Sequence, residues 1–244
     1  MKILSIDCTA APASCAIIDG EKLIAEFFVN IKLTHSQTLM PMIKEMLDSS
    51  NTLLSDIDGF AIASGPGSFT GVRIGISAVK GLAFADNKPC VGVSSLEAMA
   101  FNLKFTDCLI CSVMDARCNQ FYNANFIAKS GQLLRLCNDR ALSIEDLILD
   151  IAKITQSDEY KNMAVFVVGD GTDIFIEKLK LSVPKAAAAP NHLRYQRASG
   201  VAYMAVDLFL SNQTMLPEQL LPVYLRLPQA ERELKSKLSK HKID

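Results

Sequence analysis

The chain has 244 residues, half of them hydrophobic, so it is long enough for one large core or for two lobes of about 100 to 150 residues each. Its formal net charge of -1 at pH 7 provides no basic surface, which argues against tight independent binding to a nucleic-acid backbone. Any role on RNA is therefore expected to require a partner.

The seven cysteines are odd in number and lie mostly in apolar, strand-like runs, a pattern typical of reduced thiols in a cytosolic protein. Cys108 and Cys111 form a Cys-x-x-Cys pair within such a run and lack two further ligands, which favours a structural role over a zinc or redox site. No run of about 18 apolar residues occurs, and the start MKILSIDCTA has no cleavage signal. We expect a soluble, cytoplasmic protein without membrane contact.

The first half of the chain alternates strand-like and helical patterns. A meander of three strands is predicted first, and its last turn is Asp19-Gly20. Thr34 is the expected N-cap of the first helix, and Ser68 or Thr70 that of the second. The predicted elements are strands over 2–6, 14–18 and 22–29, a helix over 34–49, a strand over 59–63, a helix over 68–84 and a strand over 90–93.

The second half repeats this order. Ser130-Gly131 forms the second hairpin turn, and Ser143 is the expected cap of the next helix. The predicted elements are strands over 109–114, 120–127 and 132–136, a helix from 143, a strand over 164–168, and helices over 172–179 and 198–211.

A duplicated β-β-β-α-β-α unit predicts an α/β protein with the two-lobed actin-like ATPase or ribonuclease H-like fold. The expected lobes are residues 1–104, with the partner-binding helices, and residues 105–244, with the C-terminal helix and tail.

The most informative segment is GPGSFTGVRIGISAVKGLAFA, residues 65–85. A glycine-rich loop that enters a helix could hold a phosphate. However, the string is neither Gly-x-Gly-x-x-Gly nor a P-loop, because no Gly-Lys-Ser/Thr follows. Phosphate binding and a plain tight turn therefore both stay open.

The helix after this loop carries a stripe of small residues, Gly71, Gly75 and Ala78. A helical glycine costs about 1 kcal/mol relative to alanine, so the stripe suggests that another backbone approaches closely. That neighbour is either a partner helix or the preceding helix of the same chain. On the first helix, Met42 and Met46 suit either a core or an adaptable interface.

Six segments, in order along nearly the whole chain, resemble the motif set of the TsaB (YeaZ) family: ILSIDCTAAPASCAI, HSQTLMPMI, ASGPGSFTGVRIGISAVKGLA, VGVSSLEAMA, VMDAR and LLPVYLR. The resemblance implies a dimerisation subunit that pairs with TsaD, its catalytic relative, through helices matching residues 34–49 and 68–84. It also implies an ATPase subunit, TsaE, that joins the pair. The complex uses ATP and transfers threonylcarbamoyl to the tRNA adenosine beside the anticodon.

The same resemblance implies a partner interface on the two helices. Exposed apolar helices also leave open a homodimer of the isolated chain. We expect tRNA contact only through the complex, and the basic tail from Arg232 is taken as a solvated helix end. The implied interface residues are His35, Leu39, Met42, Met46, Gly71, Ile74, Gly75, Ala78 and Leu82.

Catalytic residues, metal ligands and a bound cofactor are not expected in this chain. The catalytic relative carries a His-x-x-x-His metal pair on its first helix, whereas Leu39 follows His35 by four residues here. Asp7, Asp115 and Arg117 are candidate nucleotide or lobe-junction residues, although Cys8 departs from the usual Asp-Thr-Ser pattern after Asp7. The alternative is an independent actin-like ATPase or a peptidase-like enzyme.

Overall fold

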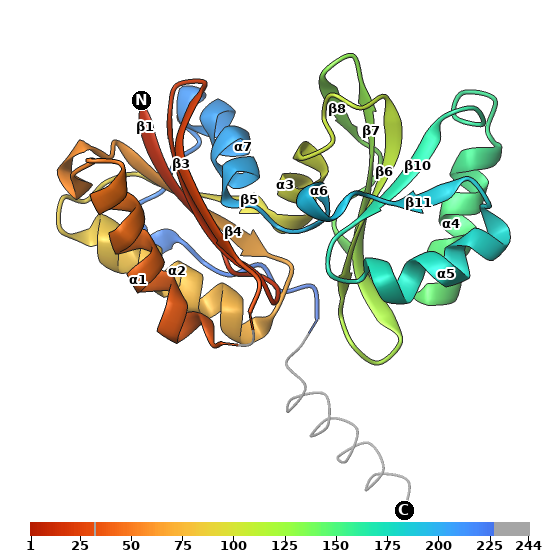
Figure 1. Cartoon of the computed structure of the whole chain (residues 1–244), viewed down its shortest axis with the longest axis horizontal. Coiled ribbons are helices and arrows are strands. Elements are labelled where there is room, and N and C mark those ends of the chain that lie inside the picture. The colour runs from red at the N-terminus through yellow and green to blue at the C-terminus, as the bar shows by residue number, and fades with distance from the viewer. Residues whose placement is uncertain (32, 227–244) are drawn as a thin grey trace, which may run out of the picture.

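Each half of the chain folds around its own sheet in the computed structural model, which describes residues 1–31 and 33–226 (Figure 1). In the first sheet the strand order is β3-β2-β1-β4-β5, with β2 antiparallel to both β1 and β3, β4 parallel to β1, and β5 parallel to β4. The elements of this half are β1 (Lys2–Asp7), β2 (Ala13–Asp19), β3 (Lys22–Val29), α1 (His35–Ser49), the 3-10 helix η1 (Leu54–Asp56), β4 (Gly59–Gly65), α2 (Phe69–Phe84) and β5 (Cys90–Ser94).

The second sheet has the order β11-β10-β6-β7-β8, and β9 pairs with β7 outside this path. Its elements are α3 (Ser95–Phe101), β6 (Cys108–Asp115), β7 (Gln120–Lys129), β8 (Gln132–Arg135), β9 (Arg140–Ser143), α4 (Ile144–Gln156), β10 (Ala164–Val168), α5 (Thr172–Ser182) and β11 (Ala186–Ala188). The chain then forms α6 (Asn191–Arg194), α7 (Ala198–Leu210) and the 3-10 helix η2 (Pro217–Gln219).

The two sheets have the same topology. The order 3-2-1-4-5 in the first corresponds to 8-7-6-10-11 in the second, with each central strand flanked by its hairpin and by two parallel strands. This confirms the predicted two-lobed α/β fold with a duplicated unit. The sequence reading missed α3, β9, β11 and α6, which have only three to seven residues and therefore show little periodicity.

Helices cover both faces of the first sheet (Figure 1). Helices α1 and α2 bury apolar side chains such as Ile43 and Val79 on one face. Helix α7 lies on the other face, where Val201 and Ala205 belong to the same apolar cluster as Ile3 of β1. The predicted assignment of residues 105–244 to the second lobe is therefore wrong for α7. This helix belongs to the first lobe, because its apolar side covers the face of the first sheet opposite α1 and α2.

After α7 the chain continues along the first lobe. Met215 forms a β-bridge with Cys90, the Val223 amide donates to the Ser64 carbonyl at 2.8 Å, and Tyr224 stacks on Phe69 with ring centroids 4.6 Å apart. These contacts bring residues 215–226 beside α2. The tail from Arg232, including His241, lies outside the described residues.

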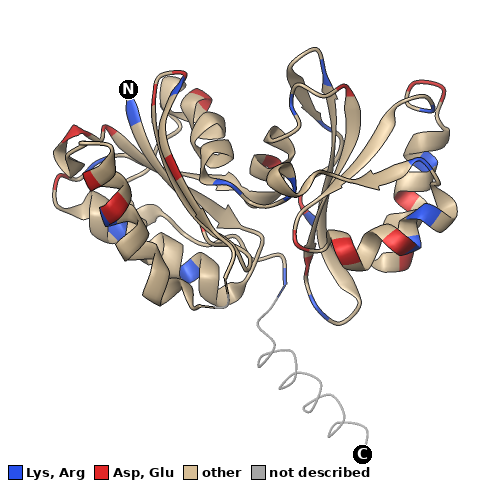
Figure 2. Cartoon of the chain, in the orientation of Figure 1, with Lys and Arg blue, Asp and Glu red and all other residues tan. Residues whose placement is uncertain are grey.

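The cysteines largely follow the expectation. Five are buried, Cys137 is half-buried and Cys118 is exposed. Cys108 and Cys111 lie in different apolar clusters on opposite faces of β6, so they do not form one site. Among the described residues, no helix is long and apolar enough to cross a membrane, and acidic and basic residues occur together on both lobes (Figure 2).

Candidate functional site

The loop before α2 packs directly against the loop after β1. The Ser68 amide donates to the Thr9 carbonyl at 2.6 Å, and a Cβ added at Gly67 would lie 2.4 Å from the same carbonyl oxygen. Ser68 caps α2, because its Oγ accepts from the Gly71 amide at 3.3 Å. One backbone donor at the start of α2 is therefore already used within the chain.

Asp7 ends β1 inside the molecule. Its Oδ1 accepts hydrogen bonds from the Thr9 amide at 2.9 Å and the Thr9 hydroxyl at 2.7 Å. Its Oδ2 has no hydrogen-bond partner among the described residues. Burial raises the pKa of this carboxyl from 3.8 to about 6, and the negative charge of Asp170 contributes to the increase.

Asp170 lies two residues after the end of β10, and the sequence reading did not single it out. Burial raises its pKa to about 6 as well, with a smaller contribution from the charge of Asp115. The sequence does contain a pattern that could have identified Asp170 as a candidate site residue, because this acid stands between two glycines directly after an apolar strand. Gly169 adopts φ +106°, and a Cβ there would meet the Val113 carbonyl oxygen at 2.0 Å, so only glycine fits this turn.

Asp115 and Arg117 lie at the exposed end of the β6–β7 hairpin. The Asp115 carboxylate accepts from the Arg117 amide at 2.7 Å. Arg117, Cys118 and Asn119 all have positive φ, between 54° and 60°, which is unfavourable for residues other than glycine. Arg226 holds this loop from the first lobe, because its Nη1 donates to the carbonyls of residues 116 and 117 at 2.6 and 3.2 Å.

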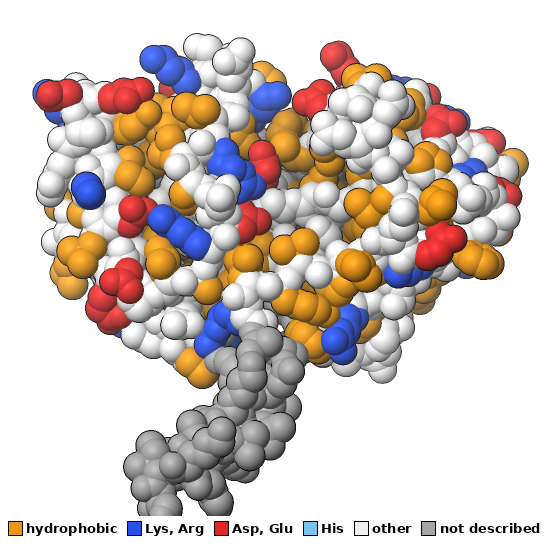
Figure 3. Space-filling view, turned by 180° about the vertical axis from the view of Figure 1, so that it is seen from behind, with side chains coloured by type: hydrophobic (Ala, Val, Ile, Leu, Met, Phe, Trp, Pro, Cys, Tyr) orange, Lys and Arg blue, Asp and Glu red, His pale blue; other side chains and the backbone are white. Residues whose placement is uncertain are grey.

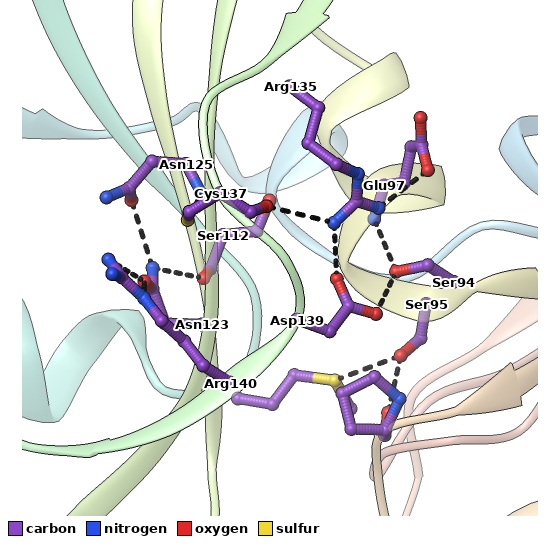
Figure 4. A network of polar contacts seen from close by, with 12 residues as sticks. Ser94, Ser95, Glu97, Ser112, Asn123, Asn125, Arg135, Cys137, Asp139 and Arg140 are labelled. Carbon is purple, nitrogen blue, oxygen red and sulfur yellow. Dashed lines mark hydrogen bonds and ion pairs between the residues drawn. The ribbon is translucent and has the colours of Figure 1, made fainter. Parts of the chain in front are cut away.

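A polar clamp of Ser94, Glu97, Arg135 and Asp139 connects the lobes (Figure 4). Arg135, at the end of β8, pairs with Glu97 of α3 and with Asp139, each at 2.6 Å. Asp139 in turn accepts from the Ser94 hydroxyl of β5 at 2.6 Å. The clamp thus ties the edge of the second sheet to the end of the first.

Most of the interface residues expected on α1 lie inside the first lobe. Leu39, Met42 and Met46 are at most 9 % exposed and belong to its core. His35 is half-buried, and its Nε2 bonds to the Ala10 carbonyl at 2.7 Å. In the isolated chain, the three apolar side chains therefore support α1 and do not form a free surface for a partner.

On α2, too, some of the expected interface residues are packed inside the lobe and others stay partly accessible. A Cβ at Gly71 would lie 2.1 Å from the Cys8 carbonyl oxygen, and one at Gly75 would lie 2.6 Å from the Cys8 sulfur. Cys8, directly after β1, is therefore the nearest neighbour of both glycines, through its backbone at Gly71 and through its side chain at Gly75, and His35 of α1 also lies 3.2 Å from a Cβ at Gly71. Ile74, Ala78 and Leu82 pack against the edge of the same apolar cluster and are half-buried, so part of each side chain remains accessible.

The outer surface of this helix pair includes apolar groups. Met40 of α1 is 46 % exposed and Phe84 of α2 is 71 % exposed. Seen from behind, hydrophobic side chains also gather beside the point where the described chain ends (Figure 3). The exposed large apolar residues within 215–226 are Leu216, Leu221, Val223 and Tyr224. No three His, Cys, Asp or Glu side chains among residues 1–31 and 33–226 are grouped so as to hold a metal ion.

Comparison with known proteins gives one result over nearly the whole chain. The family model "TsaD: tRNA N6-adenosine threonylcarbamoyltransferase" matches residues 24–233. The tRNA threonylcarbamoyladenosine biosynthesis protein TsaB of Bacillus subtilis is 30 % identical over 234 residues, covering 95 % of this chain and 96 % of that protein. The chain belongs to the TsaB family.

Solved structures agree with this assignment. The TsaB-family chain resembles "YeaZ from Pseudomonas aeruginosa" with a TM-score of 0.75 and 27 % identity, over 92 % of this chain and 99 % of that one. A second structure, of a Pseudomonas aeruginosa protein with similarity to peptidase YEAZ, gives a TM-score of 0.76 at 26 % identity with the same coverage. The resemblance to the TsaB family seen in the sequence motifs is confirmed.

Proposed function

We propose that this TsaB-family chain is a non-catalytic subunit in tRNA threonylcarbamoyladenosine biosynthesis. It forms a heterodimer with TsaD and supports the binding of TsaE, and the complex uses ATP to modify the adenosine beside the anticodon. The match across 96 % of the Bacillus subtilis TsaB protein carries the assignment to this pathway. The Thr9 carbonyl supports the non-catalytic part, because it accepts from the Ser68 amide, one of the donors with which the glycine-rich loop could hold a phosphate.

The partner surface in this proposal is the outer stripe of α2, composed of Ile74, Ser77, Ala78 and Gly81. These residues are spaced at i, i+3, i+4 and i+7, so they lie on one side of the helix. Ser77 and Gly81 are exposed, and a Cβ added at Gly81 would meet no atom within 4 Å. Small residues on an open helix face allow a second helix to approach closely. Gly71 and Gly75 cannot serve this purpose, because they face Cys8 within the lobe.

The proposal is tested by tRNA threonylcarbamoyl transfer with purified TsaD, TsaE, the adenylate-forming enzyme and ATP, with and without this chain. We expect modified tRNA only when the chain is present, and we expect the chain alone to hydrolyse neither ATP nor peptides. Transfer that does not depend on the chain, together with hydrolysis by the chain alone, would favour the independent actin-like enzyme.

The partner surface is tested separately with two substitutions at one position. Gly81→Leu places a bulky side chain in open space on the outer stripe, so the monomer should fold while heterodimer formation with TsaD is lost. Gly81→Ala adds only a methyl group and should still form the heterodimer. Equal affinity of both variants for TsaD, measured by calorimetry, would move the partner surface away from this stripe.

A further inference from the structure

Strand β7 carries two amides where its pattern calls for apolar side chains. Phe121, Asn123, Asn125 and Ile127 alternate along the strand and therefore share one face of the sheet. Phe121 and Ile127 belong to the core beneath α4 and α5. Asn123 and Asn125 lie between them, fully buried. Burying an amide without hydrogen bonds lowers the stability of the folded state, so these two asparagines require polar partners.

The two amides hold an ion pair from neighbouring elements. Nε and Nη2 of Arg140, on β9, donate to the Asn123 side-chain oxygen at 3.1 and 3.0 Å (Figure 4). Nη2 also pairs with Asp150 Oδ2, from α4, and that oxygen accepts from Asn125 Nδ2 at 3.1 Å. The guanidinium and the carboxylate are thus fixed side by side.

A cavity of about 390 Å³ opens beside this pair in the second lobe. Arg140 and Asp150 both line it, and their side chains are 28 % and 33 % exposed. The apolar walls are Leu136 and Ile154. Among the described residues, no bond is made by Arg140 Nη1 or by Asp150 Oδ1. Each of the two residues that line the cavity therefore keeps one charged terminal atom without a partner in the part of the chain that the structure describes.

We propose that this cavity binds a zwitterionic α-amino acid with an apolar side chain. Its carboxylate accepts from Arg140 Nη1, its ammonium group donates to Asp150 Oδ1, and its side chain lies between Leu136 and Ile154. An anion alone would be repelled by Asp150, and a cation alone by Arg140. A ligand with both charges complements the pair and keeps the site neutral. This site lies on the second lobe, so it does not depend on the proposed partner surface of α2.

The test is saturation-transfer NMR and calorimetry on the full chain, with L-valine, L-leucine and L-isoleucine as probes. At least one probe should bind at millimolar concentration or below. Its methyl ester lacks the carboxylate and its N-acetyl derivative lacks the ammonium group, so each should bind about tenfold more weakly or worse. Binding of all three forms with equal affinity, or of none, would overturn the proposal.

Two substitutions locate the binding. Asp150→Asn should weaken it by about tenfold or more, because a charge-assisted hydrogen bond is lost. Asp158→Asn is the matched control: Asp158 is 97 % exposed and lies outside the cavity lining, so its removal should leave affinity within about twofold. Ile154→Trp fills the cavity without altering the ion pair and should abolish binding in a chain whose circular dichroism is unchanged. If a folded Ile154→Trp chain bound normally, the amino acid would be seated elsewhere.

Discussion

At the residue scale, two glycines of α2 have different roles because different atoms lie next to them. Gly75 lies in the middle of α2 and Gly81 in its last turn, and a helical glycine costs about 1 kcal/mol relative to alanine. A Cβ at Gly75 would meet the Cys8 sulfur at 2.6 Å and the Ile62 Cδ1 at 2.8 Å. A Cβ at Gly81 would meet nothing within 4 Å. The first glycine therefore serves packing within the lobe, and the second leaves the surface open.

This difference predicts opposite effects of one substitution. Gly75→Ala should lower the free energy of unfolding by about 1 to 3 kcal/mol through overpacking. Gly81→Ala should raise it by up to about 1 kcal/mol through helix propensity. Urea unfolding of both variants measures the two changes. A Gly75→Ala chain as stable as the unmodified protein would mean that β1 moves away from α2 easily.

The buried carboxyl of Asp7 predicts a dependence of stability on pH. Its pKa is 3.8 ordinarily and about 6 in the folded chain, so between these values the folded state binds more protons than the unfolded state. Its contribution is therefore fully present below pH 3.8 and is lost as pH rises through about 6, by up to about 3 kcal/mol.

Asp7→Asn removes this titration while its side-chain oxygen can still accept from Thr9. The free energy of unfolding of the variant, relative to the unmodified chain, should increase as pH rises from 4 to 7. Asp48→Asn, at an exposed ion pair, should show little such change. A constant difference between Asp7→Asn and the unmodified chain across this range would contradict the raised pKa.

At the scale of elements, the helix starts depend on whether the capping side chain reaches the first turn. The Ser143 hydroxyl accepts from the Asp146 amide at 3.1 Å and so caps α4 as predicted. Thr34 occupies the N-cap position of α1 but makes no cap bond, because its hydroxyl donates to the Gln37 side-chain oxygen at 3.0 Å. The residue type identified both positions, but only the Ser143 side chain accepts a hydrogen bond from the first turn of its helix.

Ser143→Ala should therefore reduce the free energy of unfolding by about 1 kcal/mol. Thr34→Ala should change it by less than about half of that, since no backbone donor loses its partner. Chemical denaturation of the two variants makes the comparison, and equal losses would show that Thr34 caps α1 in solution.

At the scale of the whole molecule, the lobes are connected by contacts between residues far apart in the chain. Asp139, which pairs with Arg135, accepts from the Ser94 hydroxyl of β5, and Arg226 reaches from the first lobe to the β6–β7 loop. Helix α7 also returns to the first sheet after the second lobe is complete. The lobes are thus not independent units, although their topology is duplicated.

Arg135→Met should reveal how much the clamp contributes. The substitution keeps the apolar stem but leaves Glu97 and Asp139 without their cation, which should cost about 1 to 3 kcal/mol of unfolding free energy. Amide hydrogen exchange should become faster in α3 and β8. Lys44→Met, which breaks an exposed pair, should change stability by less than about 1 kcal/mol. If both variants behaved alike, the clamp would be only a surface ion pair.

The amino-acid sequence alone determined the duplicated α/β architecture and the positions of the long helices and strands, because hydrophobic period and turn residues are local signals. Its motifs also indicated the TsaB family. The tertiary structure decided which face of each helix is free: Leu39 and Gly75 lie inside, whereas Gly81 lies outside. It also placed α7 on the first lobe and brought Arg140 to Asp150. Such pairings depend on how distant segments meet, and a pattern along one helix or strand does not specify its neighbour.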